Sequence, residues 1–157
     1  MAEIGLGTVQ FGMNYGISNK GGKTSTLDAS KLLQIAIDNH IDVLDTASAY
    51  GTSESVLGEI LPKLHRFKVI TKITPLNLAK IEKIDIGKVE EVFMDSLKKL
   101  CQKQVYGLLL HNAHDFMAEG GTDLFERLQK FKGQGLVKKT SVTVYHTDQI
   151  KKIFAKR

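Results

Sequence analysis

Short runs of β-branched and apolar residues alternate along this chain with longer amphipathic stretches. The runs typical of strands cover residues 4–8, 42–45, 68–72, 105–110 and 139–144. Apolar residues at helical spacing predict helices over residues 27–40, 53–65, 87–100 and 122–134, and a fifth helix that opens at Thr147. Repeated strand–helix units are typical of an α/β fold with parallel strands. This alternation constrains the fold more than any other feature of the sequence.

Local signals set several of the expected boundaries. Ser25 stands three residues before Asp28, the spacing of a capping box, with Asp a weaker partner than Glu. Pro62 falls inside the second helical pattern, where we expect a kink or an end. Residues 73–86 lack a regular period, and Pro75 marks a turn there. Gly133 and Gly135 are expected to stop the fourth helix.

Two architectures fit five parallel β/α units. One is a five-stranded doubly wound sheet, which the 157 residues would complete. The other is part of a (β/α)8 barrel, which normally needs about 250 residues. Length alone favours the doubly wound sheet. With no linker and no low-complexity tract, residues 1–157 are expected to form a single domain.

Composition narrows the class of protein. Hydrophobic residues make up 42% of the chain and charged residues 25%, which excludes a wholly disordered chain. No apolar run approaches the roughly 20 residues of a membrane span, and the N-terminus does not resemble a signal peptide. The single cysteine, Cys101, excludes an internal disulfide and a cysteine-built zinc site. We therefore expect a cytoplasmic protein with no membrane contact.

The net charge of +5 comes mostly from lysines spread along the chain. Such a surface can attract nucleic acid or a phosphorylated small molecule. No basic cluster with interleaved aromatic residues appears, so we expect no nucleic-acid partner. His111 and His114 lack a further ligand at suitable local spacing, so we expect no metal site.

Four chemically active residues stand at or just after strand ends. Asp45, Lys72 and His111 end the second, third and fourth expected strands, and Tyr50 follows five residues after Asp45. Taken singly, each has a structural interpretation as a cap, a turn, a solvated strand end or a core histidine. The carboxyl ends of parallel strands gather on one face in either architecture, so these four side chains are expected to converge.

These four residues suit proton donation to a carbonyl group. A phenol is a weak acid at neutral pH, and a neighbouring ammonium such as that of Lys72 favours its ionised form. Asp45 can hold Lys72 charged, and His111 can hydrogen-bond the substrate oxygen. None of the four can supply a hydride, so a nicotinamide cofactor is implied.

The sequence also resembles a known family. The segment LDTASAYGTSESVLGE, residues 44–59, closely resembles the signature of the aldo-keto reductases, LDTA-x-x-YG-x-SE-x-x-LG. Four other segments are more weakly similar to the family and stand in the same order as in it: IGLGTVQFG (4–12), VITKI (69–73), LLLHN (108–112) and LVKKTSVTVY (136–145). The resemblance implies a (β/α)8 barrel, of which this chain would be the N-terminal portion with about five of eight units.

The resemblance also implies roles for individual residues. Tyr50 would be the general acid, Lys72 and Asp45 would tune it, and His111 would orient a small carbonyl substrate. The residues expected near the nicotinamide of NADPH are Gly7, Thr8, Asp45, Asn112 and Thr143. In the family a Ser-Asn or Ser-Val pair often ends the fifth strand, where this chain has Thr143 and Val144.

Length is the main departure from the family. Members are complete barrels, and their seventh and eighth strands carry most of the phosphate and adenine contacts. We therefore expect NADPH-dependent reduction of an aldehyde or ketone that is weak or absent in the isolated chain. The alternatives are a non-catalytic remnant or assembly subunit of a split reductase, and an unrelated doubly wound binding protein. Open sheet edges predict a homodimer or a complementary C-terminal half as partner.

Overall fold

The strands form one parallel sheet in chain order. The computed structural model describes residues 4–61 and 67–156. Its strands are β1 (Gly5–Gly7), β2 (Val43–Asp45), β3 (Lys68–Ile73), β4 (Val105–Leu110) and β5 (Val137–Val142). They lie side by side in the order β1-β2-β3-β4-β5, and every neighbouring pair is parallel. A doubly wound sheet reverses its strand order at a switch point, so that alternative is wrong. Consecutive order is that of a partial (β/α)8 barrel.

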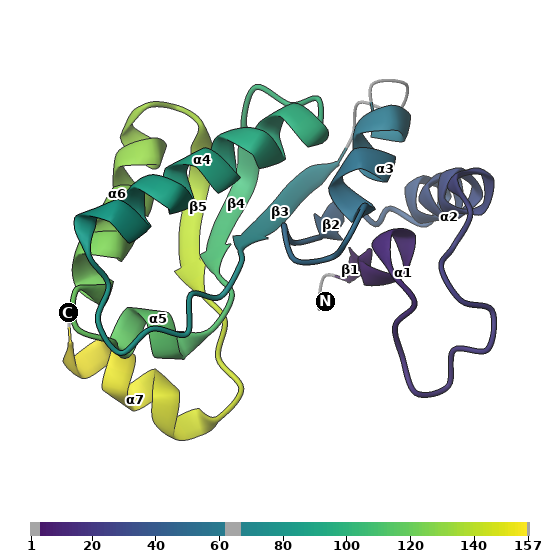
Figure 1. Cartoon of the computed structure of the whole chain (residues 1–157). Helices are drawn as coiled ribbons and strands as arrows, with labels where there is room; N and C mark the ends of the chain where they lie inside the picture. The colour runs from purple at the N-terminus through teal and green to yellow at the C-terminus, as the bar shows by residue number, and fades with distance from the viewer. Residues whose placement is uncertain (1–3, 62–66, 157) are drawn as a thin grey trace.

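Helices follow the strands (Figure 1). They are α1 (Val9–Gly12), α2 (Thr26–Asp38), α3 (Ser53–Ile60), α4 (Lys83–Lys99), α5 (Ala113–Met117), α6 (Gly121–Gly133) and α7 (Thr147–Ala155). Of the capping box expected at Ser25 and Asp28, the N-cap half is present: the Ser25 hydroxyl accepts from the Asp28 amide. The Asp28 carboxylate accepts from the Ser25 hydroxyl instead of from the Ser25 amide. Short α5 and α7 lie beside each other at the carboxyl ends of β4 and β5 (Figure 1).

Several expected boundaries were wrong. Helix α4 begins at Lys83, within the stretch expected to be irregular, because Glu82 and Asp85 form a capping box ahead of it. Two single-turn elements, α1 and α5, were not expected at all. Strand β5 begins at Val137, opposite Val105, rather than at residue 139. Helix α3 ends at Ile60, and the expected kink at Pro62 lies outside the described residues.

The core lies between the sheet and its helices. Leu44, Leu108 and Leu110 of the sheet are almost wholly buried, as are Leu57 of α3 and Phe93 of α4. Helix α3 packs very closely on the end of α4: an added Cβ on Gly58 would lie 1.9 Å from the Lys99 carbonyl oxygen. This contact fixes the helix that directly follows the Tyr50 loop.

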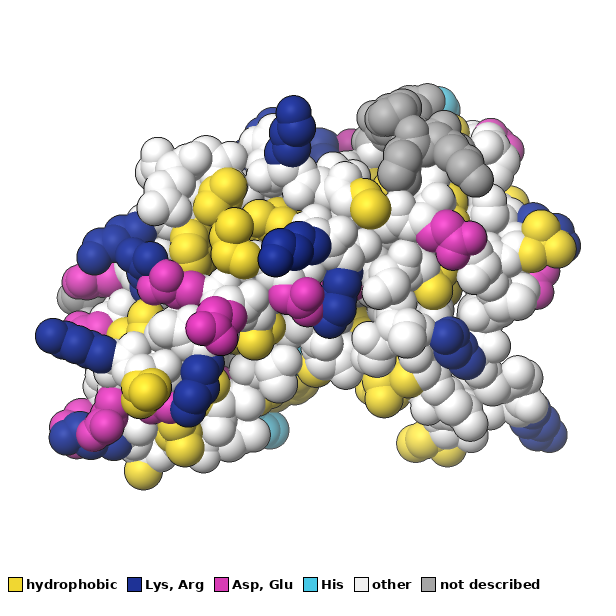
Figure 2. All heavy atoms as spheres, turned by 45° about the horizontal axis from the view of Figure 1, so that its top comes forward, with side chains coloured by type: hydrophobic (Ala, Val, Ile, Leu, Met, Phe, Trp, Pro, Cys, Tyr) yellow, Lys and Arg dark blue, Asp and Glu magenta, His cyan; other side chains and the backbone are white. Residues whose placement is uncertain are grey.

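The surface is mixed in charge. Figure 2 shows basic and acidic side chains interspersed over the face that it presents. On α4, Lys88 pairs with Asp85 and Lys99 with Asp95. Within residues 4–61 and 67–156, each helix is too short or too polar to cross a bilayer.

Candidate active site

Lys72 is the centre of the site. Its side chain is 7% exposed, and its ammonium lies 2.8 Å from the Asp45 carboxylate. The same nitrogen donates to the Thr46 carbonyl oxygen at 2.8 Å and lies 3.4 Å from the Tyr50 hydroxyl. An ammonium has three protons, so these three groups account for all of them. The Asp45 carboxylate thus pairs with this nearly buried ammonium on one side, and the Tyr50 phenol lies on the other.

Tyr50 reaches Lys72 from the loop between β2 and α3. Its amide donates to the Ala47 carbonyl, and its own carbonyl accepts from the Ser53 amide. Gly51 has a φ of +57°, a left-handed conformation that favours glycine. The turn therefore aims the phenol back over the end of β3, with the Lys72 nitrogen 4.9 Å from the ring centroid.

His111 follows β4 and packs on Tyr50. The two rings meet edge to face with their centroids 5.7 Å apart. Burial lowers the pKa of His111 below its ordinary value of 6.5, and the nearby Lys72 charge lowers it further. Its Nδ1 is buried and has no partner among the described residues. Asp45, Tyr50, Lys72 and His111 are thus brought together at one end of the sheet.

Comparisons with known proteins address the family to which this chain belongs. A model of the Aldo/keto reductase family matches residues 3–157. The chain belongs to the aldo/keto reductase family. This finding agrees with the resemblance carried by residues 44–59. A comparison with curated proteins finds no match.

Solved aldo-keto reductase structures share the fold. A Pseudomonas aeruginosa protein assigned to this group matches 97% of the chain with a TM-score of 0.77 and 24% identity. An aldo-keto reductase from Bacillus halodurans, in its holo form, matches 98% with a TM-score of 0.70 and 19% identity. One from Klebsiella pneumoniae, in complex with NADP and acetate, matches 96% with a TM-score of 0.70 and 21% identity. The chain spans 59%, 49% and 48% of these three proteins.

The residues expected to contact the cofactor differ in whether their atoms are still free to bind a ligand. Gly7 ends β1, and an added Cβ there would meet no atom within 4 Å. The Thr143 hydroxyl is buried and unpaired among the described residues. Thr8 is wholly buried, and its hydroxyl donates to the Asp45 carbonyl. Asn112 caps α5 through its side-chain oxygen and donates to Asn77 through its amide. Cofactor contact by each of them stays a prediction.

Sequence reasoning missed Asp115, which joins two loops beside the site. This residue is 2% exposed, and its carboxylate accepts from the backbone amides of Leu76 and Asn77, both at 2.9 Å. It therefore ties the loop after Lys72 to the helix after His111. Asn112 stands three residues before Asp115, the spacing of a cap and its partner, and that signal could have revealed α5.

The lowered pKa of His111 gives a pH prediction. In an NMR titration, we expect the midpoint of this imidazole to fall below 6.5, the ordinary value. The unfolded chain then binds more protons than the folded one between the lowered pKa and about 6.5. The contribution of His111 to stability is therefore complete above about 6.5 and is lost as the pH falls through that window. A midpoint at or above that of a histidine in an unfolded peptide would contradict the burial argument.

Proposed function

We propose that Asp45, Tyr50, Lys72 and His111 form the acid–base centre of a reductase that converts an aldehyde or ketone to an alcohol with NADPH. The observation that carries the proposal is the Lys72 ammonium, which is 2.8 Å from Asp45 and 3.4 Å from the Tyr50 hydroxyl. A nearly buried ammonium with its charge balanced on one side and a phenol on the other is suited to acid catalysis.

Each residue then has a defined part in the reaction. Tyr50 gives its hydroxyl proton to the carbonyl oxygen, and the phenolate left behind lies beside the Lys72 charge, which stabilises it. His111, held neutral by burial, can donate one N–H to the same oxygen. NADPH, if bound, would supply a hydride and become NADP⁺. The carbonyl carbon would gain one hydrogen with its two electrons and the oxygen would gain one proton from Tyr50, which balances the reduction.

Three described residues support a proposed nicotinamide site at this end of the sheet. His111 Nδ1 and Thr143 Oγ1 are buried polar atoms without a partner in the described part of the chain, so both retain hydrogen-bonding capacity. They follow neighbouring strands, since Leu110 pairs with Val142 one residue before each. Gly7 leaves open space at the end of β1. We assign Gly7, Thr143 and His111 to the nicotinamide end of the cofactor.

The reductase activity is tested by NADPH consumption at 340 nm with a panel of small aldehydes and ketones. We expect slow turnover, because the chain covers 59% or less of three related structures and would lack part of their cofactor contacts. NADH at the same concentration serves as the cofactor control. NADPH binding without any consumption would contradict catalysis and would favour the non-catalytic alternative.

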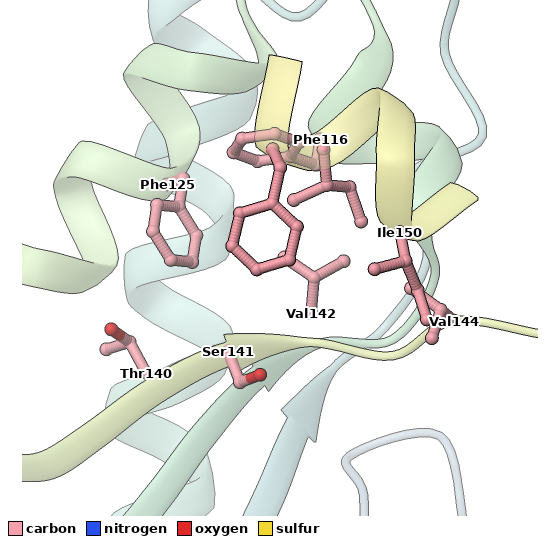
Figure 3. A pocket seen from close by; sticks show the side chains of 9 residues that line it. Phe116, Phe125, Thr140, Ser141, Val142, Val144 and Ile150 are labelled. Carbon is pink, nitrogen blue, oxygen red and sulfur yellow. The ribbon is translucent and has the colours of Figure 1, made fainter. Parts of the chain in front are cut away.

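Each of the two outer strands of the sheet has one edge without a partner strand among the described residues. Strand β1 pairs only with β2, and β5 only with β4, among the described residues. A cavity of about 200 Å³ opens beside β5 (Figure 3), where Val142 and the rings of Phe116 and Phe125 face helix α7. Phe154 of that helix is 65% exposed. Unpaired edges and exposed apolar side chains favour association with another polypeptide, a second copy or a complementary half.

Association is tested by light scattering on the purified chain at micromolar concentration. We expect a mass above that of the 17.4 kDa monomer, or capture of a complementary half when one is co-expressed. Binding of a hydrophobic dye is expected to fall when the complex forms, because the apolar cavity is covered. A folded monomer that binds no dye and captures no other chain would contradict the proposal.

A further inference from the structure

A cluster of three buried hydroxyl groups lies beneath the Tyr50 loop. Thr8 follows β1, Thr46 follows β2 and Ser53 begins α3, and all three residues are 0% exposed. Of the three, only Thr8 was predicted from the sequence to belong to the site, as a cofactor contact. Buried hydroxyls must be hydrogen-bonded to avoid a large desolvation penalty, so the pattern of their bonds is informative.

Each of the three hydroxyl protons has an acceptor in or beside the cluster. Thr46 Oγ1 donates to Ser53 Oγ at 3.0 Å, and Ser53 Oγ donates to the Thr8 carbonyl oxygen at 2.9 Å. Thr8 Oγ1 donates to the Asp45 carbonyl oxygen and also lies 3.0 Å from Ser53 Oγ. Ser53 is therefore the junction, with contacts to both of the other hydroxyls.

Each member of the cluster is joined by its backbone to a residue of the candidate centre. The Thr46 carbonyl accepts from the Lys72 ammonium at 2.8 Å. The Ser53 amide donates to the Tyr50 carbonyl at 3.0 Å. Thr8 holds the Asp45 carbonyl twice, through its hydroxyl and through its amide. The cluster thus links the main chain around the acid, the lysine and the phenol.

Packing leaves the Tyr50 loop little freedom beside this junction. An added Cβ on Gly12 would lie 1.7 Å from the Tyr50 carbonyl oxygen and 2.4 Å from the Ser53 amide nitrogen. The loop is therefore seated directly on the backbone of α1. The Ser53 hydroxyl also donates to the carbonyl of Thr8, the residue just before α1. This bond limits how far Tyr50 can shift from Lys72.

We infer that Ser53 is a positioning residue, whose hydroxyl joins Thr8 and Thr46 and thereby fixes the Tyr50 phenol against the Lys72 ammonium. Ser53 touches neither substrate nor cofactor in this role. The kinetic consequence rests on the proposed reductase function, whereas the geometric consequence does not. Misplacement of a catalytic group by about 1 Å can lower a rate by about 100-fold, and a smaller shift lowers it less.

The test compares Ser53→Ala with Ser55→Ala, a matched control that removes an exposed hydroxyl from the same helix. Tyrosine labelled at its ring carbons and lysine labelled at Nζ give NMR signals for Tyr50 and Lys72, assigned with Tyr50→Phe and Lys72→Met. We expect both signals to shift or broaden in Ser53→Ala and to stay in place in Ser55→Ala. A folded Ser53→Ala protein with both signals unmoved would overturn the inference.

Two further measurements keep the outcome decisive. If Ser53→Ala does not fold, Thr46→Val removes the donor to Ser53 with little change of shape, and the same signals decide. If the protein shows reductase activity, Ser53→Ala is expected to lower kcat about 10- to 100-fold, with KM and the NADPH Kd unchanged. Equal losses in kcat and in NADPH affinity would indicate a general structural role instead. If no form of the protein turns over, the reductase proposal fails and the NMR signals alone decide the role of Ser53.

Discussion

Replacing Tyr50 with phenylalanine is expected to lower the rate of carbonyl reduction by about 100-fold or more while NADPH binding persists. The change removes only the hydroxyl that lies 3.4 Å from the Lys72 ammonium, and the ring remains to pack against His111. The measurement is kcat at saturating cofactor, together with the Kd of NADPH from fluorescence titration.

The matched control for that variant is Tyr145→Phe. Tyr145 is 66% exposed and lies after β5, so loss of its hydroxyl is expected to leave both kcat and Kd unchanged. Unchanged turnover in Tyr50→Phe would remove Tyr50 from the mechanism. Loss of NADPH binding in Tyr50→Phe would instead indicate that the phenol holds the cofactor.

Gly58→Ala and Gly87→Ala are expected to change stability in opposite directions, although both place alanine inside a helix. At Gly58 of α3 the new Cβ would lie 1.9 Å from the Lys99 carbonyl oxygen, and backbone cannot move aside as a side chain can. We expect a loss of about 1–3 kcal/mol or more. At Gly87 of α4 the Cβ meets no atom within 4 Å, and we expect a gain of about 0.5–1 kcal/mol.

Urea unfolding followed by circular dichroism measures both changes in free energy. Helix α3 begins at Ser53, so Gly58→Ala is also expected to disturb the Tyr50 loop and to lower activity. Equal stabilisation by both substitutions would show that α3 and α4 are not in backbone contact.

Much of the fold was predictable because its units are local. The five strands and the longer helices follow from the alternation of short apolar runs with stretches of helical spacing. The apolar pattern did not predict α1 and α5, because each is a single turn and too short to show a period. It also placed the start of α4 too late, because that helix starts at a capping box and not at an apolar residue. The choice between a barrel and a doubly wound sheet needed the strand order, which local periodicity does not contain.

The candidate centre was predictable for a related reason. Parallel strands bring their carboxyl ends together, so Asp45, Lys72 and His111 converge whatever the details of packing. The residues that hold them in place were not predictable. Thr8 and Ser53 stand 45 residues apart and carry ordinary hydroxyls, so nothing in the sequence joins them. Asp115 likewise reaches backbone amides 38 and 39 residues away.

The central claim is that this site moves a hydride to a carbonyl carbon while Tyr50 supplies the proton. The most direct measurement uses NADPH deuterated at C4 of the nicotinamide with an aromatic aldehyde, followed by mass spectrometry of the product. We expect an alcohol with deuterium on the former carbonyl carbon from the unmodified chain, and only background from Tyr50→Phe. Equal deuterium incorporation with both proteins, or none with either at saturating NADPH, would contradict this account.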